Sequence, residues 1–261
     1  MNENNITELE RQGFTIIRNL LDGSKINDLR DALDLAFLEH RKTQVKNSND
    51  IQTDGVALHV LLSNDIFIDL IKELIDKKFF NFLTESFFKS KCIINSLSGL
   101  DNLPNIPNFS SLVHRDLRFY SGDFPMMVNC LLMVDDFTEE NGGTYLLPYS
   151  HLNERKPTDF EFFENAIQAT GKSGDILIFN SNIWHSSAPN KTQEHRRAIP
   201  ITVSRSFMKQ LLDYPRALGY DRMDEFDYNL QQILGYHSRV PASLDEWYQP
   251  EENRFYKKDQ D

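Results

Sequence analysis

The spacing of apolar residues divides the chain into a helical first third and a strand-rich middle. Apolar positions repeat at intervals of three and four from Ser24 to His40 and again from Ser63 to Lys77, which predicts two amphipathic helices. Helical spacing continues from Phe79 to Phe88. Ser63 is the predicted N-cap of the second helix, because a serine hydroxyl can accept a backbone hydrogen bond there. The polar residues 41–55 have no period and predict a loop, which could be a lid or only a connection.

Short runs with strand character occupy the middle of the chain, after an early run at 13–19. They are Cys92–Ser98, Ser111–Tyr120, Met126–Val134, Thr144–Leu147, Asp175–Phe179, Ile183–Ser186 and Arg197–Ser204. A helical tail follows from about Phe207. Because many short strands between turns are typical of sandwiches and barrels, we predict a mainly β protein with flanking helices. The strands are expected to form a double-stranded β-helix, the cupin-like jelly roll.

The length of 261 residues suits a single domain. We divide it into a helical N-terminal part (1–90), a jelly-roll core (91–206) and a helical C-terminal cap (207–261). Apolar residues make up 40% of the chain and include 19 Phe, which is enough for a substantial core. The net charge of −11, without a cluster of Lys or Arg, argues against binding of nucleic acid.

The ends and the cysteines bear on location. The N-terminal residues are polar and lack the apolar stretch of a signal peptide, and no apolar run approaches the roughly 18 residues of a membrane span. Two cysteines, Cys92 and Cys130, lie in apolar runs and read as buried free thiols rather than as a disulfide framework. We therefore expect a cytoplasmic protein that has no membrane partner.

The candidate chemistry begins with His114 and Asp116, which lie two residues apart in one of the predicted strands. Side chains alternate along a strand, so both would point to one face. His185 can join them if the chain between folds back. Two imidazoles and one carboxylate on one face of an iron ion leave the opposite face open, which is the arrangement in non-haem Fe(II) oxygenases. Arg196 is then a candidate partner for an acidic co-substrate.

Two longer stretches extend this pattern. Residues 141–151 read NGGTYLLPYSH, and residues 174–197 read GDILIFNSNIWHSSAPNKTQEHRR. With His114-Arg115-Asp116 they resemble the phytanoyl-CoA dioxygenase family of Fe(II)- and 2-oxoglutarate-dependent oxygenases. The family pattern is H-x-D, then N-G-x-x-x-x-x-P-G-S-H, then G-D-x-x-x-F ending in a His, and then an Arg eleven residues later. Arg196 stands eleven residues after His185, so it matches. The resemblance extends from about Ser111 to Ser204.

The resemblance implies a set of cofactors and roles. Fe(II) would be held by His114, Asp116 and His185, with 2-oxoglutarate and dioxygen at the remaining positions. The far carboxylate of 2-oxoglutarate would pair with Arg196, since a guanidinium offers a planar pair of donors. Ser187, two residues after His185, is a second candidate donor to that carboxylate. Asn129 is a further co-substrate candidate, because it could face the interior of the barrel.

One segment departs from the family pattern. Pro148-Tyr149-Ser150-His151 has a tyrosine where the family has glycine. Either this turn does not need a positive φ, or Tyr149 projects into a neighbouring group. The change leaves the predicted ligands intact, but it weakens any inference of substrate from relatives that keep the glycine. His151 itself is interpreted as a structural residue.

These observations together predict a dioxygenase that hydroxylates a small-molecule metabolite and releases succinate and CO2. Desaturation, epimerisation or cyclisation by the same cofactors stays open, as does a non-catalytic jelly-roll binding module. Related halogenases carry a small residue at the position of Asp116, so the carboxylate speaks against halogenation. No basic patch suited to coenzyme A is apparent, which favours a smaller substrate. The sequence predicts neither the identity of the substrate nor the oligomeric state.

Overall fold

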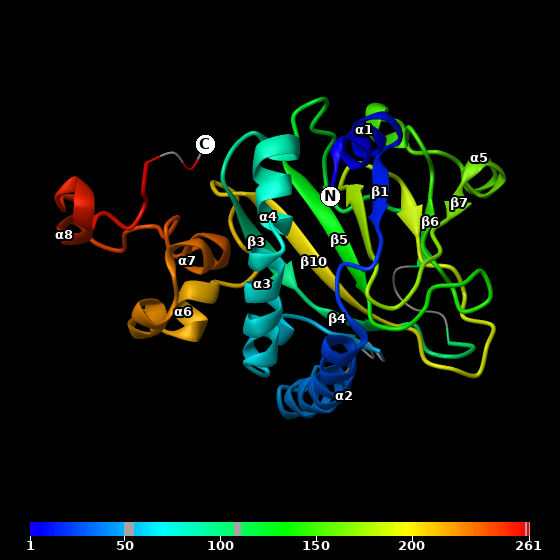
Figure 1. Ribbon diagram of the computed structural model, residues 1–261, viewed down its shortest axis with the longest axis horizontal. Coiled ribbons are helices and arrows are strands. Elements are labelled where there is room, and N and C mark those ends of the chain that lie inside the picture. Colours follow the sequence, from blue (N-terminus) through cyan, green and yellow to red (C-terminus); the bar gives the residue numbers. More distant parts are fainter. Residues whose placement is uncertain (50–54, 107–110, 259, 261) are drawn as a thin grey trace.

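The computed structural model of the chain describes residues 1–49, 55–106, 111–258 and 260 (Figure 1). Residues 50–54, which belong to the predicted loop 41–55, lie outside the described residues. Within the described part, no helix has both the length and the apolar character needed to cross a membrane.

Two antiparallel sheets form the centre of the molecule. In the described chain the larger sheet has seven strands, in the order β1-β8-β5-β10-β4-β2, with β3 also paired to β10. The smaller sheet has the order β7-β6-β9. The strands are β1 (Phe14–Ile17), β2 (Val56–Ala57), β3 (Cys92–Leu97), β4 (Gly99–Asp101), β5 (Met127–Met133), β6 (Tyr145–Leu146), β7 (Ile167–Gln168), β8 (Ile176–Asn180), β9 (His185–Ser186) and β10 (Arg197–Arg205). This mainly β architecture with flanking helices is the predicted double-stranded β-helix.

Helices surround the sheets. They are α1 (Glu3–Gln12), α2 (Gly23–Lys46), α3 (Ile66–Asp76), α4 (Phe79–Phe82), α5 (Asp159–Asn165), α6 (Tyr214–Leu218), α7 (Tyr228–Leu234) and α8 (Leu244–Trp247). A π-helical segment, Leu83–Phe88, continues α4. Short 3₁₀ turns lie at Val60–Leu62, Ser150–Leu152, Asp221–Glu225 and Glu251–Asn253. Figure 1 shows α3 and α4 beside β3 and β10, the C-terminal helices beyond them, and α5 at the opposite end.

The two faces of the large sheet bury different residues. Along β5, Val128, Cys130 and Leu132 belong to the main core, which also contains the buried residues of α2, α3 and α7. Leu131 and Met133 point the other way and pack in a second cluster with side chains from β1, β8 and β10. Because strand side chains alternate, Asn129 shares the face of Leu131 and Met133. This inner face of the large sheet carries the candidate site.

The structure corrects several details of the predicted elements. Helix α2 continues to Lys46, so residues 41–46 are helical and not part of a loop. Their side chains are mostly exposed, and a solvated last turn needs no apolar repeat. Ser63 is not an N-cap: α3 begins at Ile66, and the Asn64 side chain accepts the backbone hydrogen bond of Ile66 at 3.0 Å.

The predicted strand 111–120 was wrong. Within it, only His114 pairs with another described segment as in a sheet, through an isolated antiparallel bridge to His185. The apolar residues that suggested a strand divide between the interior and the surface, since Val113 and Leu117 are buried while Leu112 and Phe119 are exposed. A single bridge is sufficient to place His114 beside β9.

Candidate metal centre

His114, Asp116 and His185 converge although no strand carries the first two. One ligand atom from each residue lies within 4.8 Å of the others. Asp116 Oδ1 is 3.6 Å from His114 Nε2, and Asp116 Oδ2 is 3.5 Å from His185 Nε2. The His114 N–H donates to the His185 carbonyl at 3.0 Å, and the reverse bond is 2.9 Å. The backbone bridge therefore brings the two imidazoles together, with ring centroids 4.2 Å apart.

Backbone carbonyls fix the tautomer of both imidazoles. His114 Nδ1 lies 2.7 Å from the Leu112 carbonyl oxygen, and His185 Nδ1 lies 3.1 Å from that of Ile183. A carbonyl oxygen only accepts, so each Nδ1 must carry the hydrogen. In the neutral ring Nε2 then has the lone pair, and both Nε2 atoms face Asp116. Histidine ligands of metal ions are commonly oriented through the other ring nitrogen in this way.

The electrostatics also suit a metal ion. Burial is the largest influence on His185 and lowers its pKa; the Asp116 carboxylate opposes this shift, and the His114 imidazole adds to it. His185 is therefore neutral near pH 7, the form that binds metals. The side chains of His114 and Asp116 are 33% and 32% exposed, so the centre can be reached from solvent.

The Asn129 side chain holds the Asp116 carboxylate in place. Its Nδ2 donates to Asp116 Oδ2 and, at 3.1 Å, to Ser181 Oγ. Its Oδ1 accepts from the Thr202 hydroxyl at 2.8 Å. Asn129 of β5 stands opposite Thr202 of β10 on one side and opposite Phe179 of β8 on the other. The ring centroids of Phe179 and His185 lie 4.8 Å apart. Asn129 was predicted as a co-substrate candidate; in the structure its side chain contacts Asp116, and contact with a co-substrate stays a prediction.

Sequence reasoning missed Thr202 and Ser181. The alternation along the predicted strand Arg197–Ser204 places Thr202 on the same face as Ala198, which packs in the inner cluster. That alternation was the available signal for Thr202. Ser181 follows the end of β8, where no pattern fixes its direction.

Arg196 lies in a different part of the inner cluster. Its side chain is fully buried, with the guanidinium carbon 4.3 Å from the centroid of the Phe137 ring. Nη2 donates to Ser187 Oγ at 3.5 Å, whereas Nε and Nη1 have no hydrogen-bond partner in the described part of the chain. Burial lowers the pKa of Arg196 to about 10, although Asp101 and Asp135 act in the opposite direction. The structure thus brings Arg196 and Ser187 together.

These unpaired donors fit a carboxylate. A buried guanidinium without an acidic partner is costly, and a bound carboxylate would compensate its charge and accept hydrogen bonds from it. The guanidinium of the neighbouring Arg197 is already paired with acidic side chains. It donates to Asp34 at 2.8 and 3.2 Å and to Asp135 at 3.2 Å.

The conformation of Tyr149 shows whether the turn after Pro148 needs a positive φ. Tyr149 has φ 65° and ψ −5°, so this position keeps the left-handed conformation that glycine adopts easily. The side chain is 54% exposed. The first interpretation, that the turn does not need a positive φ, was therefore wrong. His151 is buried and donates from Nε2 to the Glu10 carbonyl at 3.0 Å, which links this turn to α1.

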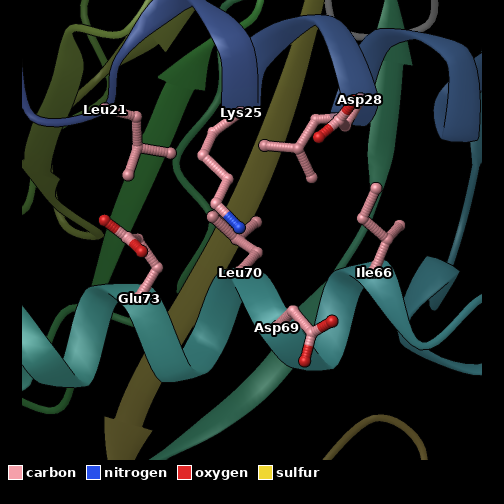
Figure 2. A pocket seen from close by; sticks show the side chains of 8 residues that line it. Leu21, Lys25, Asp28, Ile66, Asp69, Leu70 and Glu73 are labelled. Atoms are coloured by element: carbon pink, nitrogen blue, oxygen red, sulfur yellow. The ribbon is translucent and has the colours of Figure 1, made fainter.

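A separate small cavity lies between α2 and α3, as Figure 2 shows. Its volume is about 190 Å³. Leucine and isoleucine side chains line it, together with the charged groups of Lys25, Asp28, Asp69 and Glu73. None of the predicted site residues lines this cavity, so it plays no part in the candidate centre.

The fold and these groups define a double-stranded β-helix with two imidazoles and a carboxylate on its inner face. A profile of the phytanoyl-CoA dioxygenase (PhyH) family matches residues 9–198. The chain belongs to this family. Its enzymes use Fe(II) and 2-oxoglutarate with dioxygen, and the chain is an enzyme of that superfamily.

Individual relatives agree with this assignment. "Uncharacterized protein Rv1501" of Mycobacterium tuberculosis is 28% identical over 95% of this chain and 92% of its own length. "Dioxygenase sphC" of Aspergillus fumigatus is 28% identical over 52% of this chain and 39% of its own length. Among solved structures, the non-haem α-ketoglutarate-dependent epimerase SnoN from nogalamycin biosynthesis has a TM-score of 0.59 at 18% identity, covering 77% of this chain and 82% of its own. That last likeness concerns the fold.

Proposed function

We propose that this enzyme hydroxylates a small-molecule metabolite, with His114, Asp116 and His185 as its Fe(II) ligands. The observation that carries the proposal is the convergence of three ligand atoms within 4.8 Å, with both Nδ1–H groups already engaged by carbonyls. Bound Fe(II) and 2-oxoglutarate supply the oxidation: one atom of O2 enters a C–H bond as hydroxyl, and the other enters succinate as CO2 leaves.

The residues of the chain have distinct parts in this proposal. His114, Asp116 and His185 would hold the iron and would leave room for 2-oxoglutarate and dioxygen to bind it. Arg196 binds the far carboxylate of 2-oxoglutarate, assisted by Ser187. Asn129 orients the Asp116 carboxylate through the bond that joins them, and it is also the candidate for a second contact with the co-substrate. The substrate enters on the exposed side of His114 and Asp116.

A spectroscopic test addresses the ligands directly. Anaerobic addition of Fe(II) and 2-oxoglutarate should produce a weak visible charge-transfer band, and His114→Ala should remove it. His40→Ala is the matched control, because His40 is a half-buried imidazole on α2 that contacts Ser63 and no site residue. A band of unchanged intensity in His114→Ala would contradict the ligand assignment.

A product test addresses the reaction. Candidate metabolites are incubated with enzyme, Fe(II), 2-oxoglutarate and O2, and succinate and product masses are measured. Hydroxylation predicts a gain of one oxygen atom in the substrate and an equal amount of succinate. An unchanged mass with succinate would indicate epimerisation, and a loss of two hydrogens would indicate desaturation or ring closure. The absence of 2-oxoglutarate-dependent succinate from metal-loaded protein would favour a non-catalytic binding module.

The location of the enzyme is the remaining part of the proposal. We place it in the cytoplasm, where 2-oxoglutarate is at hand and where the buried thiols Cys92 and Cys130 stay reduced. Fractionation of the source cells, followed by immunoblotting, would test this.

A further inference from the structure

The reverse side of the two ligand-bearing segments carries a second pair of residues. Arg115 lies between His114 and Asp116, and Trp184 immediately precedes His185. The guanidinium carbon of Arg115 lies 4.2 Å from the centroid of a Trp184 ring, which is a close cation–π stack. The segment with His114 and Asp116 and the segment with His185 are therefore joined by the backbone bridge, by a hydrogen bond from Ser186 Oγ to the Ser111 carbonyl at 2.9 Å, and by this stack.

Arg115 is anchored by carbonyl groups and not by an acid. Its Nη2 donates to the carbonyl oxygens of Asn153 at 2.8 Å and Glu154 at 3.3 Å. Its Nε is buried and has no hydrogen-bond partner in the described part of the chain. No ion pair of Arg115 is present among the described residues. The planar guanidinium therefore serves as a spacer between Trp184 and the chain that follows the turn at Pro148.

Trp184 is held firmly enough to act as a support. Its backbone N–H donates to Ser150 Oγ at 2.9 Å, and its carbonyl accepts from the Leu147 N–H at 2.9 Å. Its ring packs in a small buried cluster with Val113 and Phe162. Val113 directly precedes His114, so this cluster and the stack on Arg115 act on the same short segment.

The segment needs such support because it lacks a strand ladder. Among the described residues, the segment 111–120 pairs in sheet fashion only at His114, and one further backbone bond runs from Leu117 to the Ser181 carbonyl at 3.3 Å. A metal centre requires its ligand atoms to be held within a few tenths of an ångström. The stack of Arg115 on Trp184 supplies a contact between the two segments where a ladder of strand hydrogen bonds is absent.

We propose that Arg115 is a positioning residue for the metal centre, acting through Trp184 to fix the distance between His114–Asp116 and His185. This inference rests on the proposed function, because it takes those three residues as the ligands. Arg115 does not touch the metal; its stack sets the separation of the two segments that do. Groups that orient metal ligands typically change metal affinity or activity by about 10- to 100-fold when they are removed.

The test measures Co(II) binding, because the visible bands of Co(II) report both affinity and coordination geometry. Arg115→Met keeps the aliphatic stem but loses the charge and the plane, and Arg115→Lys keeps the charge but loses the plane. We expect both variants to bind Co(II) at least about tenfold more weakly, with altered bands. Arg118→Met is the matched control: Arg118 is an exposed arginine three residues away and should bind like wild type.

The outcomes separate a positioning role from a merely structural one. A structural role would lower the melting temperature of the metal-free Arg115 variants and leave the Co(II) affinity and bands unchanged, which would overturn the inference. Trp184→Leu should weaken Co(II) binding as well, and adding Arg115→Met to it should cause little further loss. Fully additive losses would contradict the stack. If Arg115→Met does not fold, Arg115→Lys and Trp184→Leu give the same comparison.

Failure of this inference can be told apart from failure of the proposed function. If wild-type protein binds Co(II), His114→Ala abolishes binding and Arg115→Met binds normally, only the inference on Arg115 fails. If His114→Ala binds Co(II) as wild type does, the ligand assignment fails, and the positioning role fails with it.

Discussion

Replacing Arg196 should have opposite effects on the free protein and on its complex with 2-oxoglutarate. The guanidinium is fully buried, and two of its nitrogens lack partners in the described chain. Burial lowers the pKa of Arg196 to about 10, which corresponds to a cost of roughly 3 kcal/mol for burying the charge, at 1.36 kcal/mol per pKa unit. Arg196→Met removes that cost and keeps most of the side-chain volume.

The net gain is smaller, because the hydrogen bond to Ser187 and the stacking on Phe137 are lost as well. We expect Arg196→Met to be more stable than wild type by about 1–2 kcal/mol without ligand, a rise of very roughly 2–6 °C in Tm. Loss of the guanidinium should weaken 2-oxoglutarate binding by about 2–5 kcal/mol, at least roughly 30-fold in Kd. Wild type should gain about 2.7 kcal/mol from 2-oxoglutarate at a hundred times its Kd, whereas the variant should gain at most about 0.9 kcal/mol at that concentration.

Thermal unfolding of metal-loaded protein with and without 2-oxoglutarate measures both effects, and calorimetric titration gives Kd. Arg197→Met is the matched control. Arg197 is paired with Asp34 and Asp135, so its loss should lower stability and leave Kd unchanged. The reasoning would be refuted by an Arg196→Met protein that is less stable than wild type and is still stabilised by 2-oxoglutarate to the same extent.

Three further predictions concern stability. Tyr149→Gly should raise the free energy of unfolding by about 1 kcal/mol in urea titrations, because it relieves a left-handed tyrosine; a decrease would show that contacts of the side chain outweigh the strain. Gly13→Ala should destabilise the protein by at least about 2 kcal/mol, since φ is 92° and the new Cβ would lie 2.6 Å from His151 Nδ1; unchanged stability would contradict that crowding. Burial, and secondarily Lys257 and Lys91, lowers the pKa of His237 to about 4. The unfolded chain then binds more protons between pH 6.5 and 4, so stability should fall on acidification by up to roughly 3 kcal/mol, and His237→Gln should flatten this slope. An equal slope in the variant would assign the acid sensitivity to other groups.

The sequence predicted those parts of the fold in which burial imposes a period. The strands that became β5, β8 and β10 are apolar on both faces or alternate over five residues or more, so their pattern was clear. The segment 111–120 had similar residues but forms one bridge, because its apolar side chains serve different contacts. Pairing partners, which decide between a strand and an extended loop, are not visible in local sequence.

Helix α1 was missed for a related reason. It buries only Leu9 and is otherwise polar, so it has little apolar repeat. The residues that could have predicted this helix lie at its two ends. Asn2 and Asn5 form a capping box, and Gly13 ends the helix at φ 92°. The contact of His151 with the Glu10 carbonyl could not be predicted, because it joins residues far apart in the chain.

The residues that the sequence singled out as a candidate site come together in the structure. His114, Asp116 and His185 converge and Arg196 contacts Ser187, while their roles stay predictions. The direction of the Asn129 amide toward Asp116 depends on Ser181 and Thr202, which lie on other segments. Contacts of this kind follow from the assembled sheet and not from any single run of residues.

The central claim is that His114, Asp116 and His185 together hold one iron ion. Anomalous scattering at the iron absorption edge, from anaerobic crystals grown with Fe(II) and 2-oxoglutarate, tests it most directly. The account predicts one anomalous peak at about 2.1 Å from His114 Nε2, His185 Nε2 and an Asp116 carboxylate oxygen, a usual distance of first-row metals from such ligands. An iron peak elsewhere, or one that lacks any of these three ligands, would contradict it.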